Sequence, residues 1–489
     1  MGSLPLPEDA LADVLRRLSP RSLAASRCVC KAWRDIIDGR SLLLPDLLPH
    51  SVHGIFLMYH DLDFPAFLSH PSMEPEIFDK LHFYHLHPDS YSRSFTNILD
   101  HCNGLLLYQD FWGAYVVNPA TQRRAQLPPE PRFGGSFLSN VGHLLFDPTE
   151  SPHYEVLLVP ADRWTEEVDR EMRQQLMDKS EEWPASIWVL CMFSSRTWQW
   201  EERAFVREGD DTMMAFEEIG DPLWRASSAY WRGAFFVQCN DGSAILRISL
   251  SNDKYRVIKL PQDIGDTENN KPCLGRSKEG VCCATFDRWI SGKLRVWILD
   301  ESCGKMEWVL KYRTDIEHNI SRVMSCRREM EGPWTLHDAN SAIYYGEDVN
   351  NYGNDTKTSE HYGEDLNIDE DDNNNSEDCA DHVSNDEDDN NALLKSKFEW
   401  DSDRDNIIDD EFEVEQNIST HNTFLGFHPF KDVVFLNVSL DRAVAYHLDT
   451  CTIQDLGEVR PRYYNGPVAS VISSFVYTPC LIAEFPESK

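Results

Sequence analysis

Hydrophobic residues recur at helical spacing near the start of the chain. One stripe, at positions i, i+3, i+4 and i+7, consists of Leu11, Val14, Leu15 and Leu18. Pro7 suits the first turn of such a helix, and the basic pair Arg16–Arg17 suits its negative end. A second helical segment is predicted to start near Pro20 and to continue to Ile37. The pattern leaves open whether this segment is one helix or two helices with a break near Cys28.

After residue 49 the pattern changes to short apolar runs, rich in β-branched and aromatic residues, that are separated by turn residues. Several segments repeat one plan, in which a strand is followed by a polar turn and a second strand. These segments span residues 113–128, 188–205, 243–261, 293–311 and 442–457. A further strand usually precedes each of them, at residues 104–109, 154–160, 233–242, 280–286 and 432–438.

Repeated β-meanders of this kind predict a β-propeller, because each sheet buries its faces against its neighbours and radial closure protects the edges. A β-sandwich is the structural alternative. A sixth unit is expected from the two ends of the region, with residues 53–60 joined to residues 473–482. The predicted fold class is α+β and multidomain: a short N-terminal unit of three helices, followed by an all-β repeat domain that carries an acidic insertion.

The negative charge of the chain is concentrated in one segment. The formal net charge is −36, and residues 346–417 contain 26 Asp or Glu against 4 Lys or Arg. Low hydrophobicity and self-repulsion predict a disordered insertion. A docking surface for a basic partner and a specific ion site are the alternatives, although the ligand register of an EF-hand loop is missing. Because a phosphate footprint needs a basic surface, no nucleic-acid partner is expected.

The sequence also bears on the compartment. No run reaches the roughly 18–20 uncharged apolar residues of a membrane helix, and the first residues lack the pattern of a signal peptide. The 13 cysteines are odd in number and include no CxxC motif, which is typical of reduced thiols. We therefore expect a soluble intracellular protein, cytoplasmic or nuclear or both, with no membrane partner.

Candidate metal and catalytic sites are weak. Cys28 and Cys30 would point about 200° apart on a helix and otherwise supply only half of a zinc site, so packing cysteines are predicted. In the histidine-rich stretch 82–87, two histidines share a strand face, but no third ligand is indicated. Cys282 and Cys283 are expected to be buried in a strand. No Walker loop, GxSxG, HExxH or dinucleotide glycine motif is present, so no catalytic residue, cofactor or metal is predicted.

The helical unit is small for an independent fold. About 40 residues cannot bury enough surface to be stable without a staple, a metal or a partner. Its apolar faces therefore either pack on the following domain or dock on another protein, and physical argument alone leaves both open.

The N-terminal sequence LPEDALADVLRRLSPRSLAASRCVCKAWRDIID resembles an F-box. The similarity rests on Leu6–Pro7, the apolar stripe, the Pro20-x-Ser22-Leu23 motif and the VCKxWR motif before Ile36–Ile37, and it departs at the small residues 24–26. It implies binding to a Skp-type adaptor, which connects to a cullin and a RING subunit. The adaptor contacts that we predict on this basis are Leu6, Pro7, Leu11, Val14, Leu15, Leu18, Leu23, Val29, Cys30, Trp33 and Ile37.

The remainder resembles the F-box-associated β-propeller of plant F-box proteins. The similarity is carried by CNGLLLY (102–108), YVVNPAT (115–121), RISLSNDKYRVIKLP (247–261) and LRVWILDESCGKMEWVLK (294–311). In that family this domain is regarded as the substrate receptor. The predicted domains are an F-box at 1–45, the first part of the propeller at 50–345, the acidic insertion at 346–417 and the last part of the propeller at 418–489.

The resemblance predicts a non-catalytic, substrate-recognition subunit of a Skp–cullin–F-box type ubiquitin ligase. The helices would hold the adaptor and the propeller would hold an unknown protein target, so that catalysis is a matter of position. One alternative is an interaction protein outside any ligase that docks through the propeller or the acidic loop. Another is a propeller enzyme with the F-box as a control module, which would need a polar or metal-binding cluster at the ring axis.

Overall fold

The structure is a computed structural model of the 489-residue chain. It describes residues 7–18, 20–27, 29–40, 42, 48, 50–60, 62, 64–70, 96–131, 139–161, 186–209, 227–239, 244–261, 272–286, 292–302, 305–326, 333–338, 422–461 and 470–481. The predicted acidic insertion and the histidine-rich stretch lie outside the described residues, as do Leu6 and Cys28.

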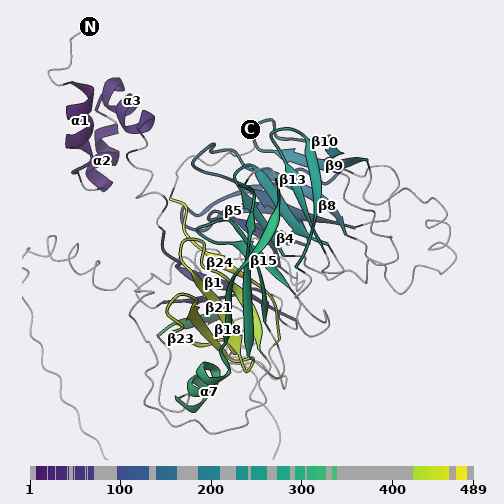
Figure 1. The fold of residues 1–489 in the computed structure, drawn as a ribbon. Coiled ribbons are helices and arrows are strands. Elements are labelled where there is room, and N and C mark those ends of the chain that lie inside the picture. The colour runs from purple at the N-terminus through teal and green to yellow at the C-terminus, as the bar shows by residue number, and fades with distance from the viewer. Residues whose placement is uncertain are drawn as a thin grey trace, which may run out of the picture.

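Three short helices are described near the N-terminus, and Figure 1 shows them in purple to one side of the strands. They are α1 (Glu8–Leu15), α2 (Pro20–Arg27) and α3 (Lys31–Gly39). Pro7 directly precedes α1, whose first turn carries Glu8 and Asp9, where negative charge is favourable next to the exposed amide groups. The second predicted segment is therefore two helices rather than one.

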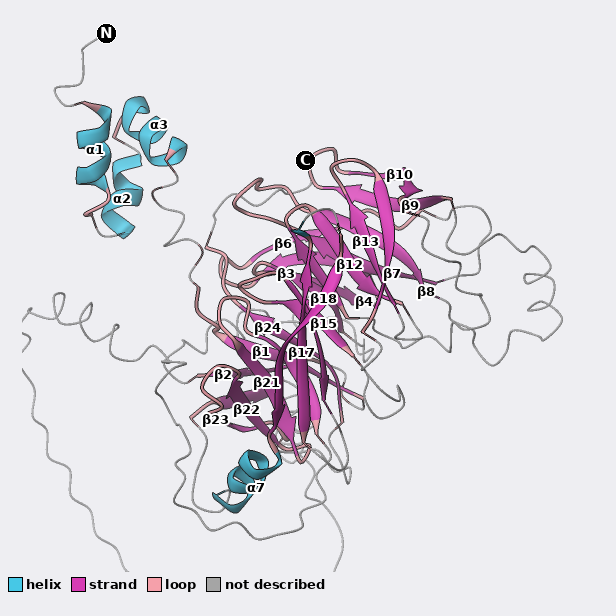
Figure 2. Ribbon diagram, in the orientation of Figure 1, coloured by secondary structure: helices cyan, strands magenta, loops and turns pink. Residues whose placement is uncertain are grey.

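The described strands form six antiparallel units of four strands, drawn in magenta in Figure 2. The first two consecutive units are β3 (Asn97–Cys102), β4 (Leu105–Asp110), β5 (Gly113–Asn118) and β6 (Arg123–Gln126), then β7 (Ser139–Leu145), β8 (Glu155–Ala161), β9 (Ile187–Ser194) and β10 (Gln199–Arg207). The next two are β11 (Ser228–Trp231), β12 (Ala234–Gln238), β13 (Ala244–Ser249) and β14 (Lys254–Lys259), then β15 (Cys273–Arg276), β16 (Val281–Phe286), β17 (Lys293–Asp300) and β18 (Glu307–Asp315). The fifth is β20 (Thr423–Phe427), β21 (Val433–Val438), β22 (Arg442–His447) and β23 (Ile453–Glu458).

Two of these units are joined edge to edge. The last strands β10 and β14 pair in parallel, with Val206 opposite Lys254 and Arg207 opposite Tyr255. This short contact merges the units β7–β10 and β11–β14 into one eight-stranded sheet. The strands that the sequence predicted in the repeated segments are all present, including every strand predicted to precede a turn segment.

The sixth unit is assembled from distant parts of the chain. Its strand order is β19 (Thr335–Asp338), β2 (Ala66–Ser69), β1 (Gly54–Tyr59) and β24 (Val471–Tyr477). The register of β1 and β24 runs from Gly54 opposite Tyr477 to Tyr59 opposite Val471. The expected pairing between the two ends of the β-region is therefore confirmed.

The hydrophobic core of the described β-region is divided into six clusters, each between two units. Leu107 and Phe193, for example, are buried in the cluster between the units β3–β6 and β7–β10. Val434 and Val296 are buried between the last two consecutive units, and Phe435 lies in the cluster that joins β20–β23 to the sixth unit. The clusters link the units in a closed cycle, which differs from the two facing layers of a β-sandwich.

The sequence predicts an all-β region after the helical unit, but the structure adds a helix to this region. Helix α7 (Glu317–Cys326) follows β18 directly, and Asp315 Oδ1 accepts the backbone N–H of Glu317 at 3.1 Å, as in a helix cap. Ile320 and Val323, three residues apart on this helix, are buried in the cluster between β15–β18 and β20–β23. The helix therefore covers one end of the contact between these two units.

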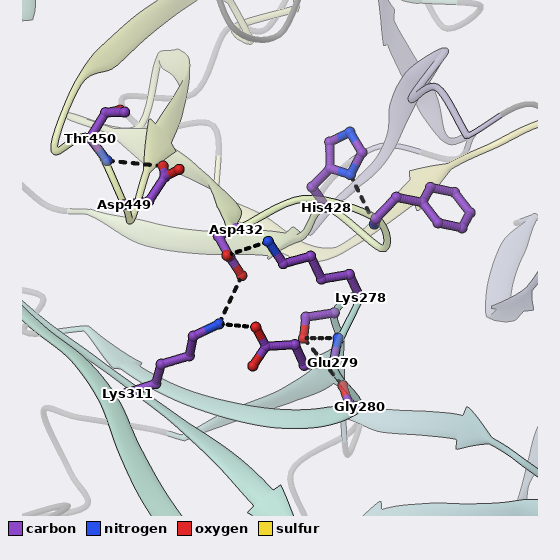
Figure 3. Close-up of polar contacts among 10 residues, drawn as sticks. Lys278, Glu279, Gly280, Lys311, His428, Asp432, Asp449 and Thr450 are labelled. Atoms are coloured by element: carbon purple, nitrogen blue, oxygen red, sulfur yellow. Dashed lines mark hydrogen bonds and ion pairs between the residues drawn. The ribbon is translucent and has the colours of Figure 1, made fainter.

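An ion network joins the same two units (Figure 3). Asp432, before β21, lies 2.7 Å from Lys278 Nζ and 3.3 Å from Lys311 Nζ, and Lys311 also contacts Glu279. Burial alone would raise the pKa of Asp432, but the hydrogen bonds and charges of the two lysines outweigh it and lower this pKa below its usual value. The carboxylate is therefore stabilised in its charged form in the folded protein.

Replacing Asp432 by asparagine is expected to lower the free energy of unfolding by about 1–3 kcal/mol at neutral pH, since it removes charge-assisted hydrogen bonds. Because the pKa is depressed in the folded state, the stabilisation is complete above the unfolded pKa and is lost as the pH falls through the folded pKa. Urea titrations should give a constant difference from wild type between pH 5 and 8 that narrows below about pH 4. Asp449→Asn is the matched control, because it changes an exposed carboxylate (Figure 3), and it should leave the free energy of unfolding at pH 7 nearly unchanged.

Candidate functional site

Four of the predicted adaptor contacts form the core of the helical unit itself. Leu11, Leu15, Leu23 and Ile37 each expose 4% or less of their surface. They pack in one cluster with Ala12, Ile36 and Leu42, and Trp33 lies partly buried against it. These residues therefore hold the three helices together rather than face an approaching partner.

The remaining described members of the predicted set are on the surface. Val14, Leu18 and Val29 expose 52%, 36% and 64% of their surface. Pro7 is exposed as well. Cys30 is exposed, so the prediction of a packing cysteine is wrong at this position, because the break between α2 and α3 places it in the connecting turn.

A second candidate site lies where the units of the β-region face one another. A cavity of about 290 Å³ is lined by β3, β7, β11, β15, β20 and β24, the strand at one end of each of the six units. Its wall includes the polar side chains of Asp100, His143, Ser228 and Arg276. Each of these comes from a different strand, so the cyclic order of the units brings them together.

Asp100 is the buried anion of this cavity. It accepts the backbone N–H groups of His101 and Leu144 at 2.8 and 2.9 Å, and the Ser228 hydroxyl lies 3.5 Å away. His143 Nδ1 lies 3.4 Å from its second carboxylate oxygen. The two backbone donors and the Ser228 hydroxyl satisfy the carboxylate, which ties β3 to β7 and β11, and they favour a structural role for Asp100.

A comparison with known families bears on the helical unit. Residues 4–44 match the F-box domain. The match covers α1, α2 and α3 and both groups of predicted adaptor contacts, the buried and the exposed. The resemblance that the sequence indicated for this region is therefore confirmed.

Curated relatives extend beyond the F-box domain. An F-box/kelch-repeat protein of Arabidopsis thaliana is 24% identical over 325 residues, which cover 61% of this chain and 73% of the relative. An F-box protein of the same plant is 32% identical over 127 residues, which cover 24% of this chain and 32% of the relative. The first of these relatives thus matches more than half of this chain, and the second about a quarter.

Solved structures are similar only at a coarse level. The structure of YCF48 bound to D1 peptide aligns with a TM-score of 0.29 and 7% identity, over 79% of this chain and 76% of that one. The structure of YjhT aligns with a TM-score of 0.22 and 10% identity, over 44% of this chain and 65% of that one. Scores this low carry no argument about fold or ligand.

The buried thiols of Cys102, which lines the cavity, and of Cys191 in β9 are not set up for nucleophilic chemistry. Burial raises the pKa of Cys102 to about 12 and that of Cys191 to about 11, so both remain protonated at neutral pH. Cys282 and Cys283 are buried in β16, as predicted. Across the described ranges, three or more His, Cys, Asp or Glu side chains never gather as a metal site would need. None of the described helices has the length and apolar character to cross a membrane.

Sequence reasoning did not find the cavity residues. Asp100, His143 and Arg276 lie on short strands whose mixed polar and apolar residues do not stand out locally. The one available signal was the Asn103–Gly104 pair in CNGLLLY, because Asn-Gly marks a tight turn between two strands. This turn joins β3 to β4 beside the cavity, with both residues at positive φ.

Proposed function

We propose that this protein is the non-catalytic, substrate-recognition subunit of a Skp–cullin–F-box type ubiquitin ligase. The observation that carries the proposal is the F-box domain at residues 4–44 with Val14, Leu18 and Val29 exposed on it. The Skp-type adaptor is the partner that an F-box implies, and these three aliphatic side chains are the apolar surface that the helical unit leaves exposed for it among the described residues.

We further propose that residues 50–345 and 418–489 form a six-bladed β-propeller that receives the target protein. Support comes from the six antiparallel units, from the core clusters that link them in a cycle, and from the sixth unit, which the two ends of the region build together. The kelch repeats named for one relative are also a propeller architecture. On this view the adaptor and the target bind to separate parts of the chain, and ubiquitin transfer depends on holding them at a fixed distance.

Substituting the exposed valines should weaken binding to the adaptor without unfolding the helical unit. Burying a valine side chain contributes about 1.5 kcal/mol, so Val14→Ser and Val29→Ser should each lower the affinity roughly tenfold. Isothermal titration of the purified protein with a Skp-type adaptor measures this effect. Val309→Ser is the matched control, because Val309 is as exposed as Val14 but lies on β18.

Variants of the buried residues test the proposal less well. Leu15 is fully buried in the core of the helical unit, so Leu15→Asp is expected to unfold this unit and would abolish adaptor binding indirectly. The surface variants avoid this ambiguity when circular dichroism shows an unchanged spectrum. A folded wild-type protein that binds neither adaptor nor adaptor–cullin complex would contradict the proposal, and so would equal affinities for Val14→Ser, Val29→Ser and Val309→Ser.

A further inference from the structure

One end of the cavity carries a fixed arginine. Arg276 ends β15, Trp231 ends β11, and Asn103 directly follows β3, so the ends of three cavity-lining strands meet here. Arg276 Nη1 donates to Asn103 Oδ1 at 2.7 Å. Asn103 Nδ2 in turn donates to the backbone oxygen of Phe146 at 2.6 Å, which fixes the orientation of the amide. The guanidinium is therefore held in place by neighbouring strands.

The donors of Arg276 are mostly unused. Its Nε is buried and has no hydrogen-bond partner among the described residues. Burial lowers its pKa, while the neighbouring Cys102 and Asp147 act in the opposite direction. Asp147 itself accepts the backbone N–H and the hydroxyl of Thr149 at 2.9 and 2.6 Å. The guanidinium therefore has donors available for a carboxylate or phosphate, which Arg binds with two parallel hydrogen bonds.

Aromatic rings and a second arginine surround this guanidinium. Arg276 Cζ lies 5.5 Å from the ring centroid of Trp231 and 5.8 Å from that of Phe430. Arg232, which is exposed in the turn after β11, has its Cζ 5.1 Å from the same Trp231 ring. In a chain with a net charge of −36, two arginines on one tryptophan form a local positive site.

We propose that this basic mouth, formed by Asn103, Trp231, Arg232, Arg276 and Phe430, binds an acidic side chain of a peptide segment in the target protein. Guanidinium groups bind carboxylates through two parallel hydrogen bonds, and the rings shield such a pair from water. The cavity of about 290 Å³ has room for side chains of an extended peptide but not for a folded domain. The inference rests on the proposed role of the β-region as a target receptor.

Fluorescence anisotropy of the full-length protein with labelled peptides tests the proposal. The probes are a hexapeptide of alternating Gly and Glu, the same peptide with Gln for Glu, and the same peptide with phosphoserine for Glu. We expect the Glu peptide to bind at least tenfold more tightly than the Gln peptide, and its affinity to fall as the salt concentration rises. Equal binding of the Glu and Gln peptides, or no binding of either acidic peptide by the folded protein, would overturn the proposal.

Two variants place the binding at Arg276. Arg276→Gln is expected to weaken the Glu peptide about 10- to 100-fold, as expected for lost charge-assisted hydrogen bonds. Arg313→Gln removes the same charge from an exposed position on β18 and should change nothing. Asn103→Asp has nearly the same size and tolerates the positive φ of this residue, but it gives up the hydrogen bond to the Phe146 oxygen; its carboxylate should pair with Arg276 and block the peptide, and circular dichroism checks that the fold is kept. Wild-type affinity in both mouth variants would refute the assignment.

Further measurements distinguish a carboxylate ligand from a phosphorylated peptide and from free phosphate. They also distinguish a failure of this inference from a failure of the proposed function. Tighter binding of the phosphoserine peptide, lost in Arg276→Gln, would support the mouth and assign a phosphorylated target. Displacement of the Glu peptide by equally low concentrations of inorganic phosphate would show a site for free anions and contradict a peptide ligand. Adaptor titrations on the same preparations report on the F-box domain alone, so lost peptide binding with intact adaptor binding contradicts only this inference.

Discussion

Replacing Asp455 by asparagine should lower the free energy of unfolding by about 3–5 kcal/mol. Arg442 Nε donates to Asp455 Oδ1 at 2.8 Å, and Arg442 Nη2 contacts the second carboxylate oxygen. The two side chains are only 7% and 2% exposed, and they join the neighbouring strands β22 and β23. Asparagine has nearly the same shape but leaves the guanidinium buried without its counter-charge, which is the costly way to break such a pair.

Urea unfolding followed by circular dichroism at pH 7 measures this loss. The control is Asp253→Asn, because Asp253 pairs with Arg203 but is 51% exposed, and asparagine tolerates its positive φ. This exposed pair should contribute less than about 1 kcal/mol. Replacing both Arg442 and Asp455 by apolar residues should cost less than Asp455→Asn alone, since no charge then stays buried. Similar losses for Asp455→Asn and Asp253→Asn would contradict the argument.

The repeated hairpins were predictable because their signals are local. In residues 243–261, apolar positions of β13 and β14 flank a polar turn, and β13 pairs with β14 from Ala244 opposite Lys259 to Ser249 opposite Lys254. The turn ends at Asp253 with a positive φ, which Asp adopts more readily than most residues. Alternation and turn chemistry therefore define both strands without knowledge of the rest of the chain.

The cavity-lining strands were largely missed, apart from the one at the end of the chain. They face a polar cavity on one side, so their sequences lack a continuous apolar run. Asp100 in β3 and Ser228 in β11 show this, because each is explained only by partners on other units. The contact between Arg276 and Asn103 joins positions 173 residues apart, and neither residue carries a signal of the other in the sequence.

The F-box surface was predictable in composition but not in orientation. The stripe of Leu11, Val14, Leu15 and Leu18 marks one broad face of the predicted helix, and all four residues are predicted adaptor contacts. In a unit of three helices, however, the other two helices decide which part of that face is covered. Leu11 and Leu15 are therefore buried inside the unit, whereas Val14 and Leu18 remain exposed.

The second large effect on stability is expected at Gly104, where the turn between β3 and β4 packs against the segment that follows β24. Gly104 has a φ of +88°, and a Cβ added there would lie 2.6 Å from Cys480 Cβ and 2.7 Å from the Cys480 backbone nitrogen. Gly104→Ala is expected to lower the free energy of unfolding by about 4 kcal/mol, because the left-handed backbone and the overpacking each contribute about 1–3 kcal/mol. Chemical denaturation followed by tryptophan fluorescence measures it.

Gly233→Ala separates the two contributions to this loss. Gly233 also has a positive φ, of +73°, but its added Cβ would meet nothing within 4 Å, so only the backbone strain of about 1 kcal/mol should appear. The backbone oxygen of Cys480 accepts Asn118 Nδ2 at 2.9 Å, which holds the segment after β24 against the turn that follows β5. Because that segment cannot move away without losing this bond, Gly104→Ala should cost several times more than Gly233→Ala. Equal losses would show instead that the segment around Cys480 shifts to accommodate the added Cβ. The closure of the β-region would then not depend on the close approach at Gly104.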